Sequence, residues 1–208
     1  MDGTLLDTLD DLAAATNHAL RVHGMPEHSH DDVRRFVGNG VGKLIERAVP
    51  EGTGEQQTEA VLSTFRAYYL AHSLDRTRPY DGIAEMLSEL RRRGCRLAVV
   101  SNKFCAATEE LCHHFFPDTI EVAIGENEAA GIRKKPAPDT VLAALRQLGV
   151  GGGQAVYVGD SDVDILTARH AGLPCISVLW GFRDRDFLQA HGAEVFAQRP
   201  QDILDNKL

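Results

Sequence analysis

The chain has 208 residues, of which 43% are hydrophobic and 25% charged, so it is long enough for one globular core domain with an insertion. Its net charge of −8 argues against a nucleic-acid partner, because phosphate backbones attract clustered Lys and Arg. No apolar run reaches the roughly 20 residues that span a bilayer, and no signal-peptide pattern is visible, so we expect no membrane partner. The four cysteines lack metal-type spacing, which suits free thiols in the reducing cytoplasm.

The first third of the chain has a helical pattern. Apolar residues recur at helical spacing from about residue 9 to residue 72, and nothing in that stretch alternates as a strand does. After residue 79 the pattern changes to short apolar runs separated by amphipathic segments. We predict strands over residues 96–100, 121–124, 155–159, 175–178 and 194–196. We predict helices over residues 83–90, 106–116, 138–148 and 165–171.

This alternation predicts a fold class and a division into domains. Strands that alternate with helices form a parallel sheet covered on both faces, so we expect a doubly wound, Rossmann-like α/β fold. The helical stretch is predicted to form a small all-helical cap domain over residues 15–79. It would be inserted into a core domain made of residues 1–14 and 80–208.

Polar residues gather where the predicted strands end. The sequence holds four such groups, in chain order Asp2-Gly3-Thr4, Ser101-Asn102, Lys135 before a proline, and Asp160-x-x-Asp164. Any one of them has an ordinary explanation as a helix cap or a turn. In doubly wound folds, however, ligands bind at the carboxyl ends of the strands. Four groups at matching strand ends therefore indicate one ligand site.

Together the four groups resemble the four motifs of the haloacid dehalogenase superfamily, and the resemblance covers the whole chain. It implies that Asp2 is the general acid/base and that its backbone carbonyl binds Mg²⁺. It implies that Thr4 orients Asp2. Ser101 would hydrogen-bond the transferring phosphoryl group, with the backbone of Asn102 assisting.

The same resemblance assigns the remaining charged residues. Lys135 would neutralise charge on the phosphoryl group and on the nucleophile. Asp160 would be an acidic ligand of Mg²⁺, and Asp164 would support either the metal shell or Lys135. These residue types suit the chemistry, because phosphoryl transfer needs existing charge to be held and neutralised and Mg²⁺ prefers oxygen ligands.

The predicted insertion carries a narrower resemblance. Residues 36–48 are similar to the cap segment of phosphoglycolate phosphatases, and so is the run Trp180-Gly181-Phe182-Arg183 after the fourth predicted strand. Gly38, Asn39 and Gly40 form either a plain turn between helices or an exposed loop that reaches an anionic substrate tail at a helix start. Arg47 either binds a substrate carboxylate or is a solvated residue on a helix face.

The first motif of the superfamily reads Asp-x-Asp-Gly-Thr, and its first Asp is the nucleophile. Asp2 matches the second Asp and Met1 stands at the x position, so the nucleophile and the first strand of the core are missing from these residues. We expect both to lie before Met1. The alternative is that Met1 is the true start, and the chain is then a catalytically inactive phosphate- or protein-binding module.

We therefore expect a Mg²⁺-dependent phosphatase that hydrolyses a small phosphorylated metabolite through an aspartyl-phosphate, most similar to phosphoglycolate phosphatase. Two carboxylates would divide the work, one as nucleophile and Asp2 as general acid and then base. The alternatives are another capped member of the superfamily, such as a β-phosphoglucomutase or a sugar or nucleotide phosphatase, or the inactive module. We expect a monomer or a homodimer.

Overall fold

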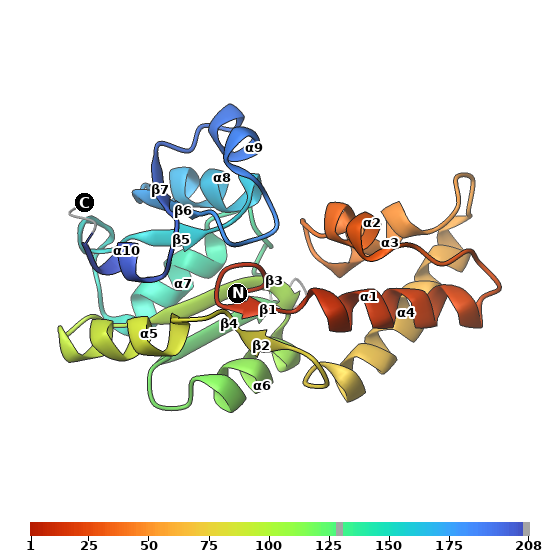
Figure 1. The fold of residues 1–208 in the computed structure, drawn as a ribbon, viewed down its shortest axis with the longest axis horizontal. Coiled ribbons are helices and arrows are strands. Elements are labelled where there is room, and N and C mark those ends of the chain that lie inside the picture. The colour runs from red at the N-terminus through yellow and green to blue at the C-terminus, as the bar shows by residue number, and fades with distance from the viewer. Residues whose placement is uncertain (128–130, 206–208) are drawn as a thin grey trace. The chain divides into compact units, whose positions relative to one another are not determined.

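The computed structural model describes residues 1–127 and 131–205, and the chain divides into two compact units. We call Met1–Asp7 with Pro79–Leu208 the core unit, and Thr8–Arg78 the helical unit. The helix α1 (Leu9–Val22) belongs to the helical unit, where it packs along α4 (Glu55–His72) (Figure 1). The domain boundaries expected from the sequence, residues 15–79 for the cap, stay a prediction.

The helical unit consists of α1 and α4 with two shorter helices, α2 (His30–Phe36) and α3 (Val41–Ala48). Its interior is formed by fully buried apolar side chains on all four helices, namely Leu20, Val33, Leu44, Ile45, Val61, Phe65 and Tyr69. A buried carboxylate closes the unit, because Asp11 on α1 accepts hydrogen bonds from the backbone and hydroxyl of Thr77, both at 2.8 Å. This contact fixes the segment that follows α4.

The core unit alternates strands and helices. The chain leaves and re-enters it through two short strands, β1 (Leu6–Asp7) and β2 (Arg78–Pro79). The further elements, in order, are α5 (Ile83–Arg92), β3 (Ala98–Phe104), α6 (Cys105–Phe115), β4 (Val122–Glu126), α7 (Asp139–Leu148), a 3-10 turn (Gly152–Gln154), β5 (Tyr157–Gly159), α8 (Asp162–Ala171), β6 (Cys175–Val178), α9 (Arg185–Ala190), β7 (Val195–Ala197) and α10 (Gln201–Asp205). β3 pairs with β4, and β5, β6 and β7 pair in that order, all in parallel.

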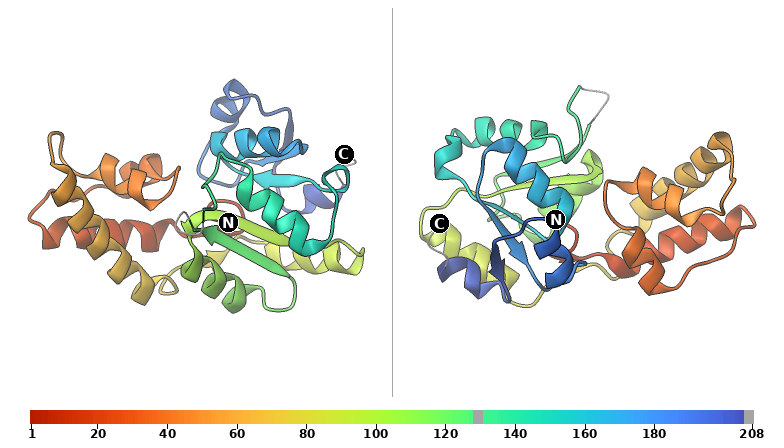
Figure 2. Two further views of the ribbon diagram at one scale, coloured as in Figure 1. Left: turned by 180° about the vertical axis from the view of Figure 1, so that it is seen from behind. Right: turned by 90° about the horizontal axis from the view of Figure 1, so that it is seen from above.

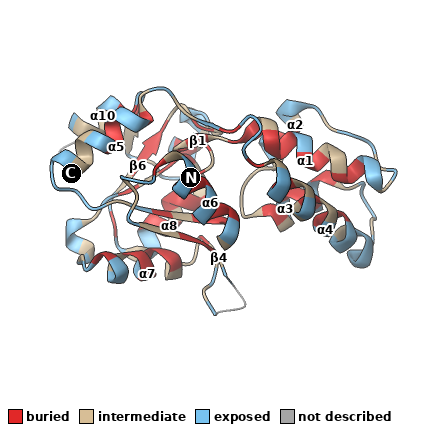
Figure 3. Cartoon of the chain, turned by 90° about the horizontal axis from the view of Figure 1, so that it is seen from below, coloured by how far each residue is buried: buried red, intermediate tan, exposed pale blue. Residues whose placement is uncertain are grey.

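Helices cover the strands of the core unit (Figure 2). Successive residues of a strand point to opposite faces, and β3 shows this directly. Val99 packs in a cluster with Leu111 of α6, whereas Val100 packs against Ala143 and Ala144 of α7. Figure 3 shows the buried residues gathered on the strands and on the inward faces of the helices. The predicted parallel α/β fold with a helical unit is thus confirmed.

The structure differs from the sequence-based prediction at several elements. The strand predicted over residues 96–100 is β3, which runs to Phe104, so the Ser101-Asn102 group lies inside it. The pairing of β3 with β4 shifts register between Val100 and Phe104, and this irregular stretch carries the polar residues. The short helices α9 and α10 were not predicted, because six and five residues are too few to show helical periodicity. Within the described residues, no helix is long and apolar enough to cross a membrane.

Candidate active site

The first residues of the chain form a tight turn that places Asp2 and Thr4. The carbonyl of Met1 accepts the backbone N–H groups of Thr4, Leu5 and Leu6, at 3.2, 2.9 and 3.1 Å. Gly3 has a φ of +70°, and a Cβ on it would lie 2.2 Å from a carboxylate oxygen of the neighbouring Asp160. Glycine is required here for both reasons, since it tolerates positive φ and leaves room for the close approach.

Asp160 directly follows β5 and is almost fully buried. One of its carboxylate oxygens accepts the hydroxyl of Thr4 at 2.8 Å, and the other accepts the backbone N–H of Phe182 at 3.0 Å. Burial, followed by the negative charge of Asp164, raises the pKa of Asp160 to about 6. The hydrogen bonds from Phe182 and Thr4 and the nearby Met1 ammonium lower this pKa, but burial and the charge of Asp164 outweigh them.

Asp164, in the first turn of α8, forms a buried cluster with Lys135 and Tyr157. The Lys135 Nζ donates to Asp164 Oδ1 at 2.7 Å, and the Tyr157 hydroxyl donates to the same oxygen at 2.8 Å. The other oxygen accepts the hydroxyl of Ser161 at 2.6 Å. Burial alone would raise the pKa of Asp164, but the Lys135 and Met1 ammonium groups, together with the hydrogen bonds from Lys135 and Ser161, outweigh burial and hold that pKa well below its usual range. Burial likewise opposes the charge on Lys135, yet Asp164 raises its pKa above the usual value.

The backbone of Lys135 is held by the side-chain amide of Asn102. Asn102 Nδ2 donates to the carbonyl of Lys135 at 2.9 Å, and Lys135 N donates back to Asn102 Oδ1 at 2.7 Å. The peptide bond from Lys135 to Pro136 is cis. Beside Asn102, the Ser101 hydroxyl is buried and accepts the backbone N–H of Lys103 at 3.2 Å. Asn102 thereby joins the irregular end of β3 to the segment that carries the catalytic Lys candidate.

Lys103 is a site residue to which the sequence analysis gave no role. Its side chain is almost fully buried, and its Nζ lies 3.4 Å from Asp2 Oδ1. This ion pair places a positive charge beside the carboxylate that the first motif identifies as general acid/base. The available signal was its position, directly after Ser101 and Asn102 at a strand end, where a buried Lys is rare unless it is paired.

Tyr157 was also missed, and Trp180 was named only as part of a family-like run, without a contact. Tyr157 lies in the predicted strand over residues 155–159 and was read only as part of an apolar run, although its hydroxyl reaches Lys135 and Asp164. Trp180 Nε1 donates to the carbonyl of Thr4 at 2.9 Å, which fixes the N-terminal turn from the far end of the chain. Neither contact follows a local sequence pattern, because the partners are far apart in the chain.

The loop residues of the helical unit form a compact turn of their own. Gly38, Asn39 and Gly40 all have positive φ, at 131°, 62° and 86°, and α3 begins directly after them. Arg47 on α3 folds back over this loop, since its guanidinium donates to the carbonyl of Phe36 at 2.7 Å and to that of Gly38 at 3.3 Å. Arg47 therefore positions the loop, and its predicted role as a carboxylate ligand stays a prediction.

The oxygen groups of the core unit suit a hard divalent cation that takes only a few of its ligands from the protein. Among the described residues, no group of three or more His, Cys, Asp or Glu side chains is arranged to hold a metal ion. Mg²⁺ commonly uses only one or two carboxylates, with waters and substrate phosphate completing its octahedron. Asp160 offers such a buried carboxylate beside the turn that carries the Asp2 carbonyl. Asp164 gives its oxygens to Lys135, Tyr157 and Ser161, so its predicted role as metal ligand is untested while its support of Lys135 is visible.

The structure thus brings the predicted core residues into one site, and the predicted loop residues lie in the other unit. Thr4 bonds Asp160, Asp2 pairs with Lys103, and Lys135 bonds both Asn102 and Asp164. The backbone N–H of Asp160 donates to Asp164 and links these groups, and Ser101 is next to Asn102 in β3. Gly38, Asn39, Gly40 and Arg47 belong to the helical unit.

Comparison with known proteins places the chain among phosphatases. Residues 1–178 match the sequence pattern of the haloacid dehalogenase-like hydrolase family. The chain is 35% identical to a phosphoglycolate phosphatase of Caulobacter vibrioides, over 98% of this chain and 86% of that protein. It is 30% identical to the N-acetylmuramic acid 6-phosphate phosphatase of Pseudomonas aeruginosa, over 99% and 91%. A crystal structure from Lactobacillus delbrueckii subsp. bulgaricus superposes with a TM-score of 0.92 at 36% identity, covering 98% of this chain and 93% of that one.

Proposed function

The chain belongs to the haloacid dehalogenase-like hydrolase family and is a phosphoric monoester hydrolase, and we propose that it uses Mg²⁺ to hydrolyse a small phosphomonoester that carries a carboxylate. The observation that supports this proposal best is that Asp160 after β5, Asp2 in the N-terminal turn and Lys135 in the segment before α7 are linked through Thr4, Lys103 and Asp164. They supply a general acid/base, a metal ligand and a fixed positive charge within one site.

The acid/base role rests on Asp2 and its neighbour Lys103. In the proposed first step, a carboxylate oxygen forms a bond to phosphorus while the bond from phosphorus to the leaving oxygen breaks, and Asp2 donates its proton to that oxygen. In the second step, Asp2 takes a proton from water as the water oxygen attacks phosphorus, and the carboxylate leaves. The motif puts the attacking carboxylate on the residue immediately before Met1, a position that these 208 residues do not include.

Lys135 keeps its positive charge throughout both proposed reaction steps. Asp164 and Tyr157 hold its ammonium in place, and Asn102 fixes its backbone, so the positive charge need not reorganise as the phosphoryl group moves. Ser101 is proposed to hydrogen-bond a phosphoryl oxygen from the adjoining end of β3. Bound Mg²⁺, held by Asp160 and the Asp2 carbonyl, would supply further neutralisation of phosphoryl charge. Burial of the site keeps water from screening these charges.

Two observations support the proposed substrate class, namely the loop of the helical unit and the phosphatases to which the chain is similar. We propose that the loop of Gly38, Asn39 and Gly40 recognises an anionic tail, with Arg47 holding the loop in shape. Loop and helix start together offer backbone N–H groups to an anion. The similarity to phosphoglycolate phosphatases favours a carboxylate tail, and the similarity to an N-acetylmuramic acid 6-phosphate phosphatase keeps a larger sugar acid as the second candidate.

The decisive experiment compares three proteins on p-nitrophenyl phosphate with Mg²⁺. The 208-residue chain should show almost no turnover, whereas a version preceded by an apolar strand ending in Asp should turn over. The matched control replaces that Asp by Asn, which keeps the strand and removes the nucleophile. Robust Mg²⁺-dependent turnover by the 208-residue chain, or equal turnover by the Asp and Asn versions, would overturn the proposed mechanism. A panel of phosphate esters with and without a carboxylate then tests the substrate class.

A small phosphorylated metabolite is thus the proposed partner. The cytoplasmic location and the monomeric or homodimeric state expected from the sequence stay predictions.

A further inference from the structure

Lys135 stands in a segment that is neither helix nor strand. Residues 133–138 precede α7, which begins at Asp139. A turn closes around Lys135, since the N–H of Ala137 donates to the carbonyl of Lys134 at 3.0 Å. A segment outside regular secondary structure depends on tertiary contacts for its position. The place of the Lys135 ammonium therefore depends on how the rest of the core unit holds this segment.

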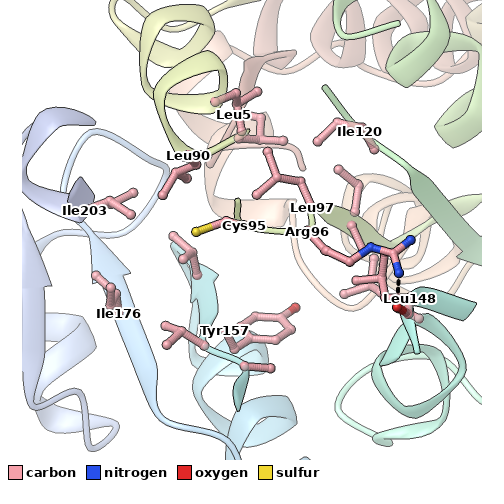
Figure 4. A pocket seen from close by; sticks show the side chains of 18 of the residues that line it. Leu5, Leu90, Cys95, Arg96, Leu97, Ile120, Leu148, Tyr157, Ile176 and Ile203 are labelled. Carbon is pink, nitrogen blue, oxygen red and sulfur yellow. Dashed lines mark hydrogen bonds between the residues drawn. The ribbon is translucent and has the colours of Figure 1, made fainter. Parts of the chain in front are cut away.

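Helix α8 holds the side chain of Lys135 from its first turn. Lys135 Nζ donates to Asp164 Oδ1 at 2.7 Å. Tyr157 borders the apolar cavity of the core unit (Figure 4), and its hydroxyl donates to the same oxygen at 2.8 Å. The other oxygen of Asp164 accepts the backbone N–H of Asp160 at 3.2 Å. The ammonium is thus fixed relative to the first turn of α8 and to the turn that carries the proposed metal ligand.

The last turn of the same helix holds the backbone of the segment. His170 Nδ1 lies 2.7 Å from the carbonyl oxygen of Pro136, the residue directly after Lys135. A carbonyl oxygen can only accept, so Nδ1 must carry the hydrogen of this bond. His170 is exposed, so the contact lies outside the packed interior of the core unit. Its loss would therefore leave the packing of α8 on the strands in place.

Two anchors hold the backbone on adjoining residues. Asn102 exchanges hydrogen bonds with the N–H and the carbonyl of Lys135, and His170 binds the carbonyl of Pro136. An α-helix is a stiff element with a rise of about 1.5 Å per residue, so Asp164 and His170 keep a constant separation. Helix α8 therefore sets the distance between the backbone of the segment and the ammonium group.

We propose that His170 is a positioning residue for Lys135. Its hydrogen bond fixes the backbone beside Lys135 while Asp164 fixes the ammonium, so one helix determines where this charge stands. A charge that is held in place need not reorganise as the phosphoryl group moves, and a small misplacement lowers the rate. The contact itself does not depend on the reaction, but its effect on the rate rests on the role proposed above for Lys135.

The hydrogen bond is tested first by the protonation of the imidazole ring. At about pH 9, where imidazole rings are in general neutral, the long-range ¹H–¹⁵N spectrum of the 208-residue chain should show His170 with its hydrogen on Nδ1. His28 is the opposite internal reference, because its Nε2 lies 2.7 Å from the carbonyl of Ala48. A hydrogen on Nε2 of His170, or a mixture of both forms, would refute the contact. Loss of the signal in His170→Asn assigns it.

Amide hydrogen exchange tests whether the contact fixes the segment. His170→Ala should speed exchange at the N–H groups of Lys135 and Ala137 by about three- to tenfold. His170→Asn should restore the slower exchange, because the Asn amide offers an N–H donor at the same side-chain position. His191→Ala is the matched control, since His191 Nδ1 makes the same exposed contact with the carbonyl of Phe187, also at 2.7 Å. Unchanged exchange in His170→Ala, or the same increase in His191→Ala, would overturn the proposal.

The same three variants in the strand-extended protein give the effect on the rate. His170→Ala should lower kcat by about three- to tenfold with little change in KM, the loss expected for one neutral hydrogen bond. His170→Asn should recover most of that rate, and His191→Ala should keep it. A lower thermal midpoint with an unchanged kcat in His170→Ala would mean that His170 only adds stability. The strand-extended protein also serves for the two spectroscopic measurements if the 208-residue chain does not stay folded.

Lys135→Met separates this proposal from the proposed function. If Lys135→Met keeps full turnover, the role proposed for Lys135 fails, while the ring spectrum and the exchange rates still decide whether His170 holds the segment. If Lys135→Met abolishes turnover and His170→Ala leaves kcat unchanged, only the positioning role of His170 is refuted.

Discussion

The side-chain amide of Asn102 and the backbone of Lys135 exchange two hydrogen bonds across 33 positions of the chain, at 2.9 and 2.7 Å. This reciprocal pair replaces the contacts of a β-ladder at a point where β3 has lost its register. It makes Asn102 a positioning residue, in addition to the backbone role implied by the motif. The pair is therefore the first feature to test.

Asn102→Ala, made in the strand-extended active protein, should lower kcat by roughly ten- to a hundredfold with a smaller change in KM. It leaves two buried backbone groups unsatisfied, at a cost of about 1–3 kcal/mol each, and frees the segment that carries Lys135. The matched control is Asn17→Ala, because Asn17 makes the same reciprocal pair with the backbone of His28, both at 2.9 Å. Equal losses of kcat in the two variants would show that Asn102 contributes only to stability.

Tyr157→Phe removes one hydroxyl from the Lys135–Asp164 cluster and keeps the ring. We expect a free energy of unfolding lower by about 1 kcal/mol, a several-fold lower kcat, and an altered pH profile of kcat. The profile should change because the hydroxyl orients both charged groups. Tyr68→Phe is the control, since the Tyr68 hydroxyl has no hydrogen bond among the described residues and its ring stacks on His18. An unchanged pH profile would assign Tyr157 to packing.

Asp160→Asn should reduce kcat on the order of a hundredfold or more and raise the Mg²⁺ concentration needed for half-maximal rate. The substitution removes an anionic oxygen from a site for a hard cation while it preserves the shape of the side chain. Asp162→Asn, two residues further along, makes the same change of charge outside the cluster. Full activity of the Asp160 variant at ordinary Mg²⁺ would show that Asp160 only anchors the turn at Thr4.

The raised pKa of Asp160 predicts how the metal-free protein responds to pH. In the folded state this pKa is about 6, against a usual value of 3.8, so the folded state binds more protons than the unfolded state between about pH 4 and pH 6. Stability should therefore fall as pH rises through that window. Thermal unfolding in EDTA, compared with Asp160→Asn, checks the sign. A midpoint that rises across this range relative to the variant would contradict the assignment.

The loop of the helical unit is tested by substrate selectivity. Arg47→Ala releases the carbonyls of Phe36 and Gly38, and Asn39→Ala removes the loop's polar side chain. Each should lower kcat/KM for a carboxylate-bearing phosphomonoester by roughly ten- to a hundredfold, the loss of a charge-assisted hydrogen bond. An aryl phosphate without a tail should be affected much less. Lys43→Ala on the same helix controls for loss of charge. Equal losses on both substrates would leave only a structural role.

The order of strands and helices could be predicted because it depends on local patterns. Apolar runs such as those before Ser101 and Asp160 indicate buried strands, and their polar ends mark the ligand edge of a parallel sheet. The same logic identified Asp2, Lys135 and Asp160 as site residues. The prediction failed for short elements. The helices α9 and α10 and the extension of β3 to Phe104 contain too few residues to show a period.

Which side chains bind one another was decided only by the tertiary structure. Thr4 and Asp160 lie 156 positions apart, and Lys103 meets Asp2 across almost half of the chain. No periodic pattern encodes such pairs, because they depend on how independent strands are placed beside each other. The sequence by itself determined the family, the fold class and the chemical types of the site. Only the tertiary structure decided that Asp164 binds the Lys135 ammonium and that Asn102 holds the Lys135 backbone, because both contacts join segments far apart in the chain.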